Sequence, residues 1–425
     1  MVLYPFPTRL LPKRIRQTAV FGWVFLAASA WAQPATSTPT LKQALDAAWQ
    51  VNSQSRSLDN RRSELAAREK AASSWISGEP VAGIAYRTDR LNKNEGFREY
   101  EAELELPLWN PGVRSAAQAD VSAQRTGFDG QFGAAKLKLA GELRALSASI
   151  ATAQIELDLN KRKLLDADAL SQDLNRRVKA GENARVDGLQ SQVLVQQART
   201  AIAQAESQLS RYQSQWRSMT GLTAVALPDE PLASSLSGQP GQSGTAPISA
   251  DHPALRFAQA QVGSAQAKLA LANADKRDPM SVGVSIGRER ADFAAVNETK
   301  LRIALRIPLG GDNRNAPRQA AARAELDTAQ ADLDAAQRLL PAEVAAASAD
   351  LRAARTAQIA ASERVRLSTE VQTLITKSWR LGDSDLPTRL RADNEQFEAN
   401  LSLAKASIDV QRAIANLNQA HGILP

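Results

Sequence analysis

The sequence repeats itself once, and this internal duplication constrains the fold more than any other feature. Three pairs of short motifs lie at one constant spacing of 201 residues. The pairs centre on Pro107 and Pro308, on Gly181 and Gly382, and on Gly221 and Gly422. Three matches at one offset indicate two copies of one unit rather than chance similarity. We therefore expect repeats at 33–227 and 251–425, joined at 228–250 by a surface linker rich in Pro, Gly and Ser.

Each repeat is expected to contain a helix, two strands, a long helix, a turn and a further helix. The strands are the segments in which apolar and polar residues alternate with a period of two. We place them at 81–89 and 98–108 in the first repeat and at 280–288 and 299–309 in the second. The helical turns are expected around the glycines at 178–188 and 379–389. The sequence therefore predicts a mainly α fold with a β-barrel segment.

The predicted strands have one apolar and one charged face, and each is about ten residues long, enough to cross a bilayer when tilted. Trp75, Phe97 and Trp109 flank them, as aromatic residues do at a membrane interface. The alternative is a soluble amphipathic hairpin. Four strands cannot close a barrel by themselves, and an open edge in lipid would leave backbone groups unpaired. If the strands cross a membrane, the chain must oligomerise, and a homotrimer supplies twelve strands.

The charged faces of the strands carry opposite signs in the two repeats. The charged positions are Glu99, Glu101, Glu103 and Glu105 in the first repeat and Lys300, Arg302 and Arg306 in the second. In a barrel, these side chains would face the lumen. We expect facing strands to form ion pairs that stiffen the wall. A cation preference of the pore is the alternative role.

Apolar and small residues recur every three or four positions in the helical segments, which is the pattern of coiled-coil seams with close helix contacts. The first long helix, 112–178, would span roughly 100 Å at about 1.5 Å per residue. The two shorter helices of each repeat together nearly match the long one in length. Two short helices stacked end to end could thus lie beside one long helix, with the join near Pro341, and form a hollow helical cylinder.

The N-terminal segment 1–32 has the features of a secretory signal peptide. Basic residues precede an apolar run, and Ala30-Trp31-Ala32 has the small-x-small pattern of a cleavage site. We therefore expect a chain that is exported beyond the inner membrane of a bacterium. A short N-terminal anchor helix is the alternative. No later stretch of the sequence reaches about 18 apolar residues, the length of a membrane-spanning helix.

The composition excludes several classes of site. The chain has no cysteine, which rules out disulfides, thiolate metal sites and a lipid anchor on an N-terminal cysteine. With two histidines and three methionines, no metal site or cofactor is expected. The net charge of +7 falls to about +3 without the basic leader, too little to predict nucleic-acid binding. His252 and His421 lie near predicted helix ends, and no nucleophile–base–acid spacing or phosphate-binding loop indicates an enzyme.

The two strand-to-helix junctions and the two glycine turns together carry a family resemblance. The junctions read LPLW around Pro107 and IPLG around Pro308, and the turns read KAGENARVD around Gly181 and RLGDSDLPT around Gly382. In this duplicated order, the motifs resemble those of the TolC-type outer-membrane efflux factors over nearly the whole mature length. The resemblance implies a trimeric twelve-stranded β-barrel in the outer membrane, continued into a long periplasmic α-helical barrel. It also implies a passive exit duct, surrounded by outer-membrane lipid, that docks on a periplasmic adaptor (membrane fusion) protein and an inner-membrane RND-type pump.

The resemblance places adaptor docking and gating at the periplasmic tips of the helices. The tip residues are Gly181, Asp187, Gly382, Asp383 and Asp385. In the best-known members, carboxylates six and nine residues after the second turn glycine form an acidic constriction. This chain has Thr388 and Arg391 at those positions, so a constriction here would have to use the nearby aspartates. Helix capping is the alternative role of these aspartates.

The motif around Trp109 and the missing lipid cysteine look most like the heavy-metal efflux branch of the family, whose substrates are cobalt, zinc, cadmium or nickel. Drug efflux and type I protein secretion are the other substrate classes that stay open. Two different classes of protein are also considered. A periplasmic adaptor should have more strand-rich domains and no twofold repeat, and a structural coiled-coil protein would not explain the duplicated strands.

Overall fold

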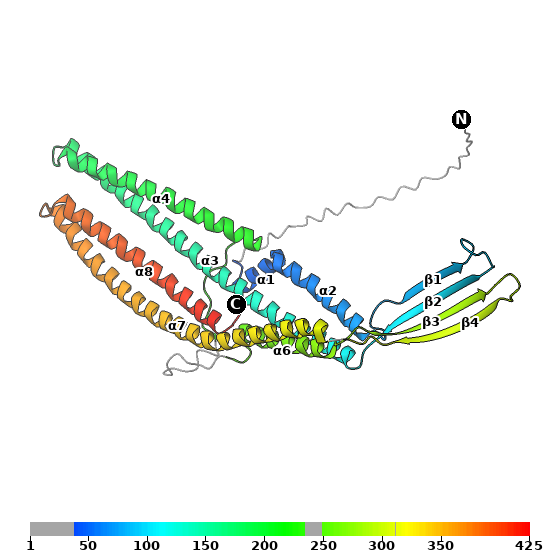
Figure 1. Ribbon diagram of the computed structural model, residues 1–425. Coiled ribbons are helices and arrows are strands. Elements are labelled where there is room, and N and C mark those ends of the chain that lie inside the picture. Colours follow the sequence, from blue (N-terminus) through cyan, green and yellow to red (C-terminus); the bar gives the residue numbers. More distant parts are fainter. Residues whose placement is uncertain (1–37, 234–248, 311) are drawn as a thin grey trace, which may run out of the picture. The chain divides into compact units, whose positions relative to one another are not determined.

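The computed structural model describes residues 38–233, 249–310 and 312–425 (Figure 1). The predicted signal peptide, 1–32, and most of the predicted linker, 228–250, lie outside the described residues. Residues Thr38–Pro425 form one compact unit. Within the described ranges, no helix combines the length and the apolar character needed to cross a membrane.

Both repeats contain a similar succession of elements. In the first repeat these are α1 (Leu41–Val51), α2 (Ser53–Ser73), β1 (Val81–Thr88), β2 (Arg98–Leu108), α3 (Val113–Lys179) and α4 (Arg185–Thr220). In the second they are α6 (Pro253–Ala274), β3 (Met280–Arg290), β4 (Glu298–Arg306), α7 (Asp312–Leu381) and α8 (Leu386–Ala420). The prediction of a mainly helical fold with a small sheet is confirmed.

One predicted helix is interrupted. The sequence predicts one helix before the two strands of the first repeat, whereas the structure has two helices that meet at Asn52. Asn52 has an extended backbone conformation, and its side-chain oxygen accepts a hydrogen bond from Gln54 N at 2.8 Å. An asparagine that caps the next helix in this way cannot continue the preceding one. The second of the two helices, α2, ends at Ser73, and the chain then turns toward the sheet.

The four strands form one antiparallel sheet in the order β1-β2-β3-β4. The central pairing joins the two repeats, because β2 of the first lies against β3 of the second, with Ala102 opposite Ile286. β1 and β4 are the two edges, and in the part of the chain described each has a strand partner on one side. Each repeat thus contributes one hairpin to a sheet that is open at two edges.

The helices form a layer in which the two repeats also meet in the middle (Figure 1). α3 packs against α4 and against α8, and α8 packs against α7. Nearer the sheet, α3 contacts both α2 and α6, and α6 contacts α7. α2 and α4 therefore line one edge of the layer and α7 lines the other. Because α3 has 67 residues, its start next to the strands and its end at the turn are separated by roughly 100 Å.

A buried polar cluster, consisting of Arg144, Glu230, Asn418 and Gln419, ties the start of the linker and the C-terminal segment to α3. Arg144 is 3% exposed and donates two hydrogen bonds to the carboxylate of Glu230, at 2.7 and 2.5 Å. It also donates to Gln419 Oε1 at 2.6 Å and to the carbonyl of Ile423 at 3.0 Å. Asn418 Nδ2 donates to the same carboxylate at 3.0 Å. The two buried charges thus compensate each other and have further hydrogen-bond partners, which a buried ion pair requires.

Candidate functional site

One face of the sheet is apolar and exposed. Ile84 is 92% exposed and Ile303 is 73% exposed. The other exposed apolar side chains of this face are Tyr86, Tyr100, Leu104, Val284, Ile286, Leu301 and Leu305. A contiguous apolar surface of this kind marks contact with lipid or with another protein. The strands have 8, 11, 11 and 9 residues, which is close to the length that crosses a bilayer when tilted.

The opposite face of the sheet carries the predicted charged residues. Arg302 Nη1 lies 3.1 Å from Glu101 Oε1, and Arg306 Nη2 lies 3.0 Å from Glu103 Oε1. Arg306 also pairs with Glu105. The remaining pairs are Glu99 with Arg87 at 3.2 Å, and Lys300 with Glu289 at 2.7 Å. Each charged position that the sequence places on this face therefore has a partner of opposite sign.

Strand β3 lies between the acidic residues of β2 and the basic residues of β4, and its small side chains let the two groups meet. On the charged face it presents Ser281, Gly283, Ser285 and Gly287. Ser285 is 5% exposed, and its hydroxyl donates to Glu101 at 3.0 Å. Sequence reasoning missed this role of β3. The run of Ser and Gly at alternate positions of one strand is the signal that pointed to it.

The two predicted strand-to-helix junctions differ in structure. Pro107 lies inside β2, and its carbonyl accepts a hydrogen bond from Ser77 N at 3.0 Å. Pro308 lies two residues beyond the end of β4. Trp109, directly after β2, donates from its indole nitrogen to the carbonyl of Ser74 at 3.0 Å. The first junction is thus bonded to the segment that follows α2, which fixes where the sheet joins the helices.

The two helical turns share one backbone pattern. Gly181 and Gly382 have φ angles of +80° and +85°, which glycine adopts without strain. In each turn, the N–H after the glycine donates to a carbonyl five residues earlier, at 2.9 Å in the first turn and 3.0 Å in the second. These bonds close both turns as Schellman motifs. A side chain at either glycine would meet open space, so the backbone conformation alone requires glycine.

The predicted tip aspartates are placed at the starts of helices and in a turn. Asp385 caps the N-terminus of α8 by accepting a hydrogen bond from Thr388 N at 3.0 Å. Hydrogen bonds from Thr388 lower the pKa of Asp385 from its ordinary value. Asp187, in the first turn of α4, accepts from Asn183 Nδ2 at 3.1 Å, and Asp383 is exposed in the second turn. Helix capping accounts for Asp385, and an acidic constriction stays a prediction.

Trp379 joins the two helical hairpins near their turns, a contact that sequence reasoning missed. It is 7% exposed and packs against Leu170 and Leu174 of α3. The guanidinium groups of Arg177 and Arg389 lie 4.6 and 4.0 Å from the centre of its ring, within the range of cation–π contacts. Burial lowers the pKa of Arg389. A large aromatic residue three positions before a turn glycine was the available signal.

The two histidines of the chain lie together, away from the sheet and the turns. His252 is 3% exposed and caps α6, because its Nδ1 accepts a hydrogen bond from Ala254 N at 3.2 Å. Burial lowers the pKa of His252, and burial and the neighbouring His252 lower the pKa of His421. Among the described residues, no three His, Asp or Glu side chains are placed to hold a metal ion.

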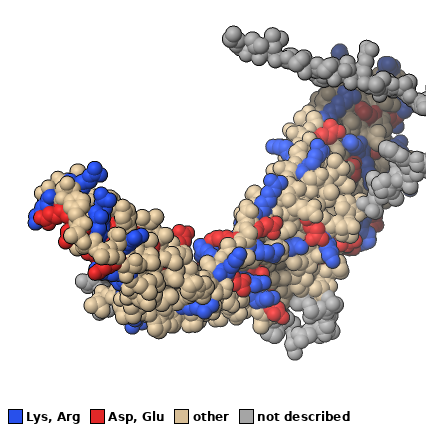
Figure 2. Space-filling view, turned by 90° about the vertical axis from the view of Figure 1, so that its right-hand side faces the viewer, with Lys and Arg blue, Asp and Glu red and all other residues tan. Residues whose placement is uncertain are grey.

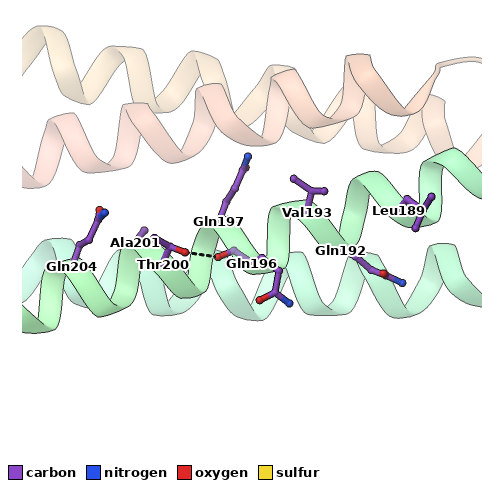
Figure 3. A pocket seen from close by; sticks show the side chains of 8 residues that line it. All are labelled: Leu189, Gln192, Val193, Gln196, Gln197, Thr200, Ala201 and Gln204. Atoms are coloured by element: carbon purple, nitrogen blue, oxygen red, sulfur yellow. Dashed lines mark hydrogen bonds between the residues drawn. The ribbon is translucent and has the colours of Figure 1, made fainter.

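A shallow groove runs along one face of α4 (Figure 3). Its uncharged lining comes from this one helix and consists of Leu189, Gln192, Val193, Gln196, Gln197, Thr200, Ala201 and Gln204. Leu189 and Val193 are 51% and 54% exposed. Thr200 Oγ1 donates to Gln196 O at 3.0 Å, so part of the polar surface is already bonded within the helix. Because α4 lies at one edge of the helical layer, this face has room for a further helix.

Charged side chains of both signs are interspersed over the face of the molecule shown in Figure 2. Nucleic-acid-binding proteins gather their basic residues on one face or along one helix. On the face shown, the charges follow a mixed pattern instead.

The two-faced sheet and the long helices that continue from it make up the TolC-like fold seen in outer-membrane efflux channels. Residues 248–423 match the family model described as "Outer membrane efflux protein". Protein CyaE of Bordetella pertussis is 29% identical over 259 residues, which cover 58% of this chain and 54% of CyaE. The matched region thus spans about half the length of that relative.

Solved structures show the same fold. A membrane protein from Pseudomonas aeruginosa has a TM-score of 0.71 and 19% identity, with 90% of both chains covered. The CmeC outer membrane channel of Campylobacter jejuni has a TM-score of 0.72 and 13% identity, with 97% of this chain and 94% of CmeC covered. The resemblance to TolC-type efflux factors is therefore confirmed. The second repeat matches the outer membrane efflux protein model, and the chain has the fold of the outer-membrane efflux channels.

Proposed function

We propose that the protein is a passive exit duct of the bacterial outer membrane that extends into the periplasm and carries out no catalytic step. The observation that carries this proposal is the sheet, with one exposed apolar face and one face of paired charges. The apolar face suits lipid and the charged face suits a water-filled lumen. The outer-membrane location agrees with the names of the family model and of the channels with the same fold.

Closure of the duct follows from the edges of the protomer. β1, α2 and α4 belong to the first repeat and lie at one edge, while β4 and α7 belong to the second repeat and lie at the other. Placing the second-repeat edge of one copy against the first-repeat edge of the next pairs strand with strand and helix with helix. Repeating this contact gives a closed ring, and three copies give twelve strands. Lipid requires such closure, since every backbone group within the membrane must be paired.

The groove on α4 supports the same contact. Its exposed Leu189 and Val193 are matched on α7 by Leu367, Val371 and Leu374, which are 48%, 51% and 60% exposed. Two helices whose free faces are apolar at a three-to-four spacing pack as a coiled coil. We therefore propose that α4 of one protomer lies beside α7 of its neighbour.

The periplasmic tips are the proposed docking site for an adaptor protein and, through it, an inner-membrane RND-type pump that supplies the energy. Family members are trimeric channels that work with adaptors and inner-membrane pumps. In this chain, the turns at Gly181 and Gly382 end the two helical hairpins that would receive the adaptor. Opening a closed tip would move these hairpins apart, and the contacts of Trp379 with Leu174 and with Arg177 are among those that would have to break.

The proposed substrates are divalent heavy-metal cations such as cobalt, zinc, cadmium or nickel. The charged face of the sheet carries six carboxylates and four basic groups in each protomer. These are Glu99, Glu101, Glu103, Glu105, Glu289 and Glu298, with Arg87, Lys300, Arg302 and Arg306. This excess of negative charge favours the entry of cations. Drug efflux and type I protein secretion are the runners-up.

Deletion of the gene tests the duct and its substrate together. Growth is measured across graded nickel, cobalt, zinc and cadmium, alongside a dye and a detergent, with the intact gene restored as the control. Sensitivity to metals alone, reversed by the intact gene, supports a cation-efflux duct. Sensitivity to the dye and the detergent with normal metal tolerance would make the protein a drug-efflux duct. Purified protein that stays monomeric in detergent and gives no conductance in a lipid bilayer would contradict the channel itself.

A further inference from the structure

A cavity of about 290 Å³ lies where the sheet meets the helices, and we propose that it binds a phospholipid headgroup of the periplasmic leaflet of the outer membrane. Its lining comes from the end of β2, the start of α3, the connection between α6 and β3, and the first turns of α7. We call it the junction cavity. The inference rests on the proposed function, because only a sheet that spans the membrane would place the junction cavity at the membrane surface.

Two asparagine side chains in the junction cavity have an oxygen atom that receives no hydrogen bond from any described residue. Asn110 is 6% exposed and Asn315 is 5% exposed. Their amide nitrogens donate to main-chain carbonyls at 3.0 Å, those of Arg277 and Asp278 for Asn110 and that of Ala272 for Asn315. These bonds fix the orientation of both amides, so the unpaired atoms are the oxygens. Buried acceptors that no described residue donates to indicate that a bound molecule supplies a donor.

Three basic side chains, Lys276, Arg277 and Arg318, line the same cavity together with two carboxylates, Asp275 and Asp278, so the basic groups are in excess by one. No ion pair joins Lys276 or Arg277 to another described residue, while Arg318 lies 3.5 Å from Asp275. Cations beside buried acceptors suit a ligand with a phosphate at one end and a hydrogen-bond donor at the other. Phosphoethanolamine and phosphoglycerol headgroups have this arrangement. Their phosphate oxygens accept from the basic residues, and their ammonium or hydroxyl groups donate to the asparagine oxygens.

The depth of the junction cavity relative to the membrane favours a membrane lipid, rather than a free anion, as the source of the phosphate. The cavity lies where β2 ends at Leu108 and β3 begins at Met280. Each of these strands is long enough to reach from one surface of a bilayer to the other, so the cavity would lie at one of the two surfaces. Trp109 lines the cavity. Trp75, in the segment that leads to the sheet, is 66% exposed. Tryptophan is enriched at the level of lipid headgroups, so the cavity and its ligand would share one depth.

Native mass spectrometry of the full-length channel tests the inference. The protein is released from nanodiscs of phosphatidylethanolamine, phosphatidylglycerol or phosphatidylcholine, and the fraction that retains a lipid is measured. Retention of the first two should exceed that of phosphatidylcholine by about tenfold, the factor associated with one additional hydrogen bond, because choline has no hydrogen to donate. Equal retention of the three lipids would overturn the inference.

A matched pair of variants tests the basic residues without disturbing a buried position. Lys276→Gln/Arg277→Gln should lower retention of phosphatidylethanolamine about tenfold, since the phosphate loses its charge-assisted hydrogen bonds. Arg352→Gln/Arg355→Gln removes the same charge from exposed positions of α7, roughly 50 Å along the helix from Arg318, and should retain lipid like the parent. Equal retention in all three proteins would assign the lipid to another surface.

Two further outcomes separate the possible sources. If millimolar inorganic phosphate occupies the delipidated channel and no lipid is retained, the ligand is a free anion and the lipid assignment is wrong. A protein that inserts and conducts but shows no lipid preference contradicts this inference alone. A protein that does not insert into a bilayer contradicts the proposed function instead.

Discussion

The molecule uses ion pairs in two regions, and solvent exposure separates what they do in each. In the buried polar cluster, the side chains of Arg144 and Glu230 are 1% and 9% exposed. On the sheet, the side chains of Arg302 and Glu101 are 69% and 15% exposed. Loss of a buried partner leaves a charge without compensation, whereas water replaces an exposed partner. The polar cluster therefore contributes strongly to the stability of the folded chain. The ion pairs of the sheet contribute less to stability and mainly set the charge of one face of the sheet.

The replacement Glu230→Ala should have the largest effect on stability, because it leaves the buried guanidinium of Arg144 without its carboxylate. We expect the free energy of unfolding to fall by about 3–5 kcal/mol, measured by denaturant unfolding of the purified protein. The control, Glu206→Ala, removes a carboxylate that is 56% exposed and 3.8 Å from Lys161. Its loss should be about 0–1 kcal/mol. Similar losses in the two variants would remove the distinction between the regions.

Trp379→Ala should rank second, because Trp379 is buried but lies near the end of the helices. Loss of its packing should cost about 3 kcal/mol and should ease separation of the two hairpins. We therefore expect a higher single-channel conductance in planar bilayers, together with earlier unfolding. Trp75→Ala is the control, since Trp75 is 66% exposed at the opposite end of the helices. Parent-like conductance and stability of Trp379→Ala would mean that Trp379 does not link the hairpins.

Acid should destabilise the protein through His252 by a smaller amount. The folded state lowers the pKa of His252, mainly by burial, so below pH of about 6.5 the unfolded chain binds more protons. The contribution of the neutral His252 to the free energy of unfolding is therefore fully present above that pH, and it is lost as the pH decreases toward the lowered pKa. Of the neighbouring groups, His421 at the end of α8 would repel a second positive charge, and Glu343 of α7 favours protonation.

The variant His252→Asn isolates this effect, because asparagine also caps a helix but does not titrate. Free energies of unfolding are measured for both proteins between pH 8 and pH 5. The parent should lose more stability than the variant over this range. An equally steep decline in both would assign the acid sensitivity to other groups.

Reversal of the two exposed arginines of the sheet should have the smallest effect on stability. Arg302→Glu/Arg306→Glu places like charges beside Glu101 and Glu103 and makes the charged face of the sheet more negative by about four charges per protomer. For the proposed trimeric channel, we expect slightly lower heat resistance and a stronger cation preference, read from reversal potentials in a salt gradient. Arg352→Glu/Arg355→Glu on α7 is the control. Unchanged heat resistance would show that these pairs do not stiffen the wall.

The sequence predicted those parts of the fold whose signals are local and periodic. Alternation with a period of two marks the strands, and the glycines at 181 and 382 mark turns that do need a positive φ. The break at Asn52 was not predicted. The flanking residues favour helix, and a single asparagine that caps a helix with its side chain does not change that composition noticeably. The contacts of the buried polar cluster and those of the charged face of the sheet were the hardest to predict.

Those contacts join residues far apart in the chain. Arg144 and Glu230 are 86 residues apart, and Glu230 and Asn418 are 188 apart. No periodicity relates such positions, so only the packed structure shows that they meet. The opposite charges of β2 and β4 were predicted to pair, but as directly facing strands. The strand order places β3 between them, and the small residues of β3 were needed for the pairing.

The ion pairs of the sheet also bear on how a duplicated gene came to encode this protein. Glu101 and Arg302 occupy equivalent positions of the two repeats, since 201 residues separate them, as they separate Pro107 and Pro308. Glu105 and Arg306 share this spacing. If the two repeats were identical, both positions would carry the same residue, and no pair of opposite charges could form between them. The divergence of the two repeats therefore allows β2 and β4 of one chain to carry opposite charges and to pair across β3.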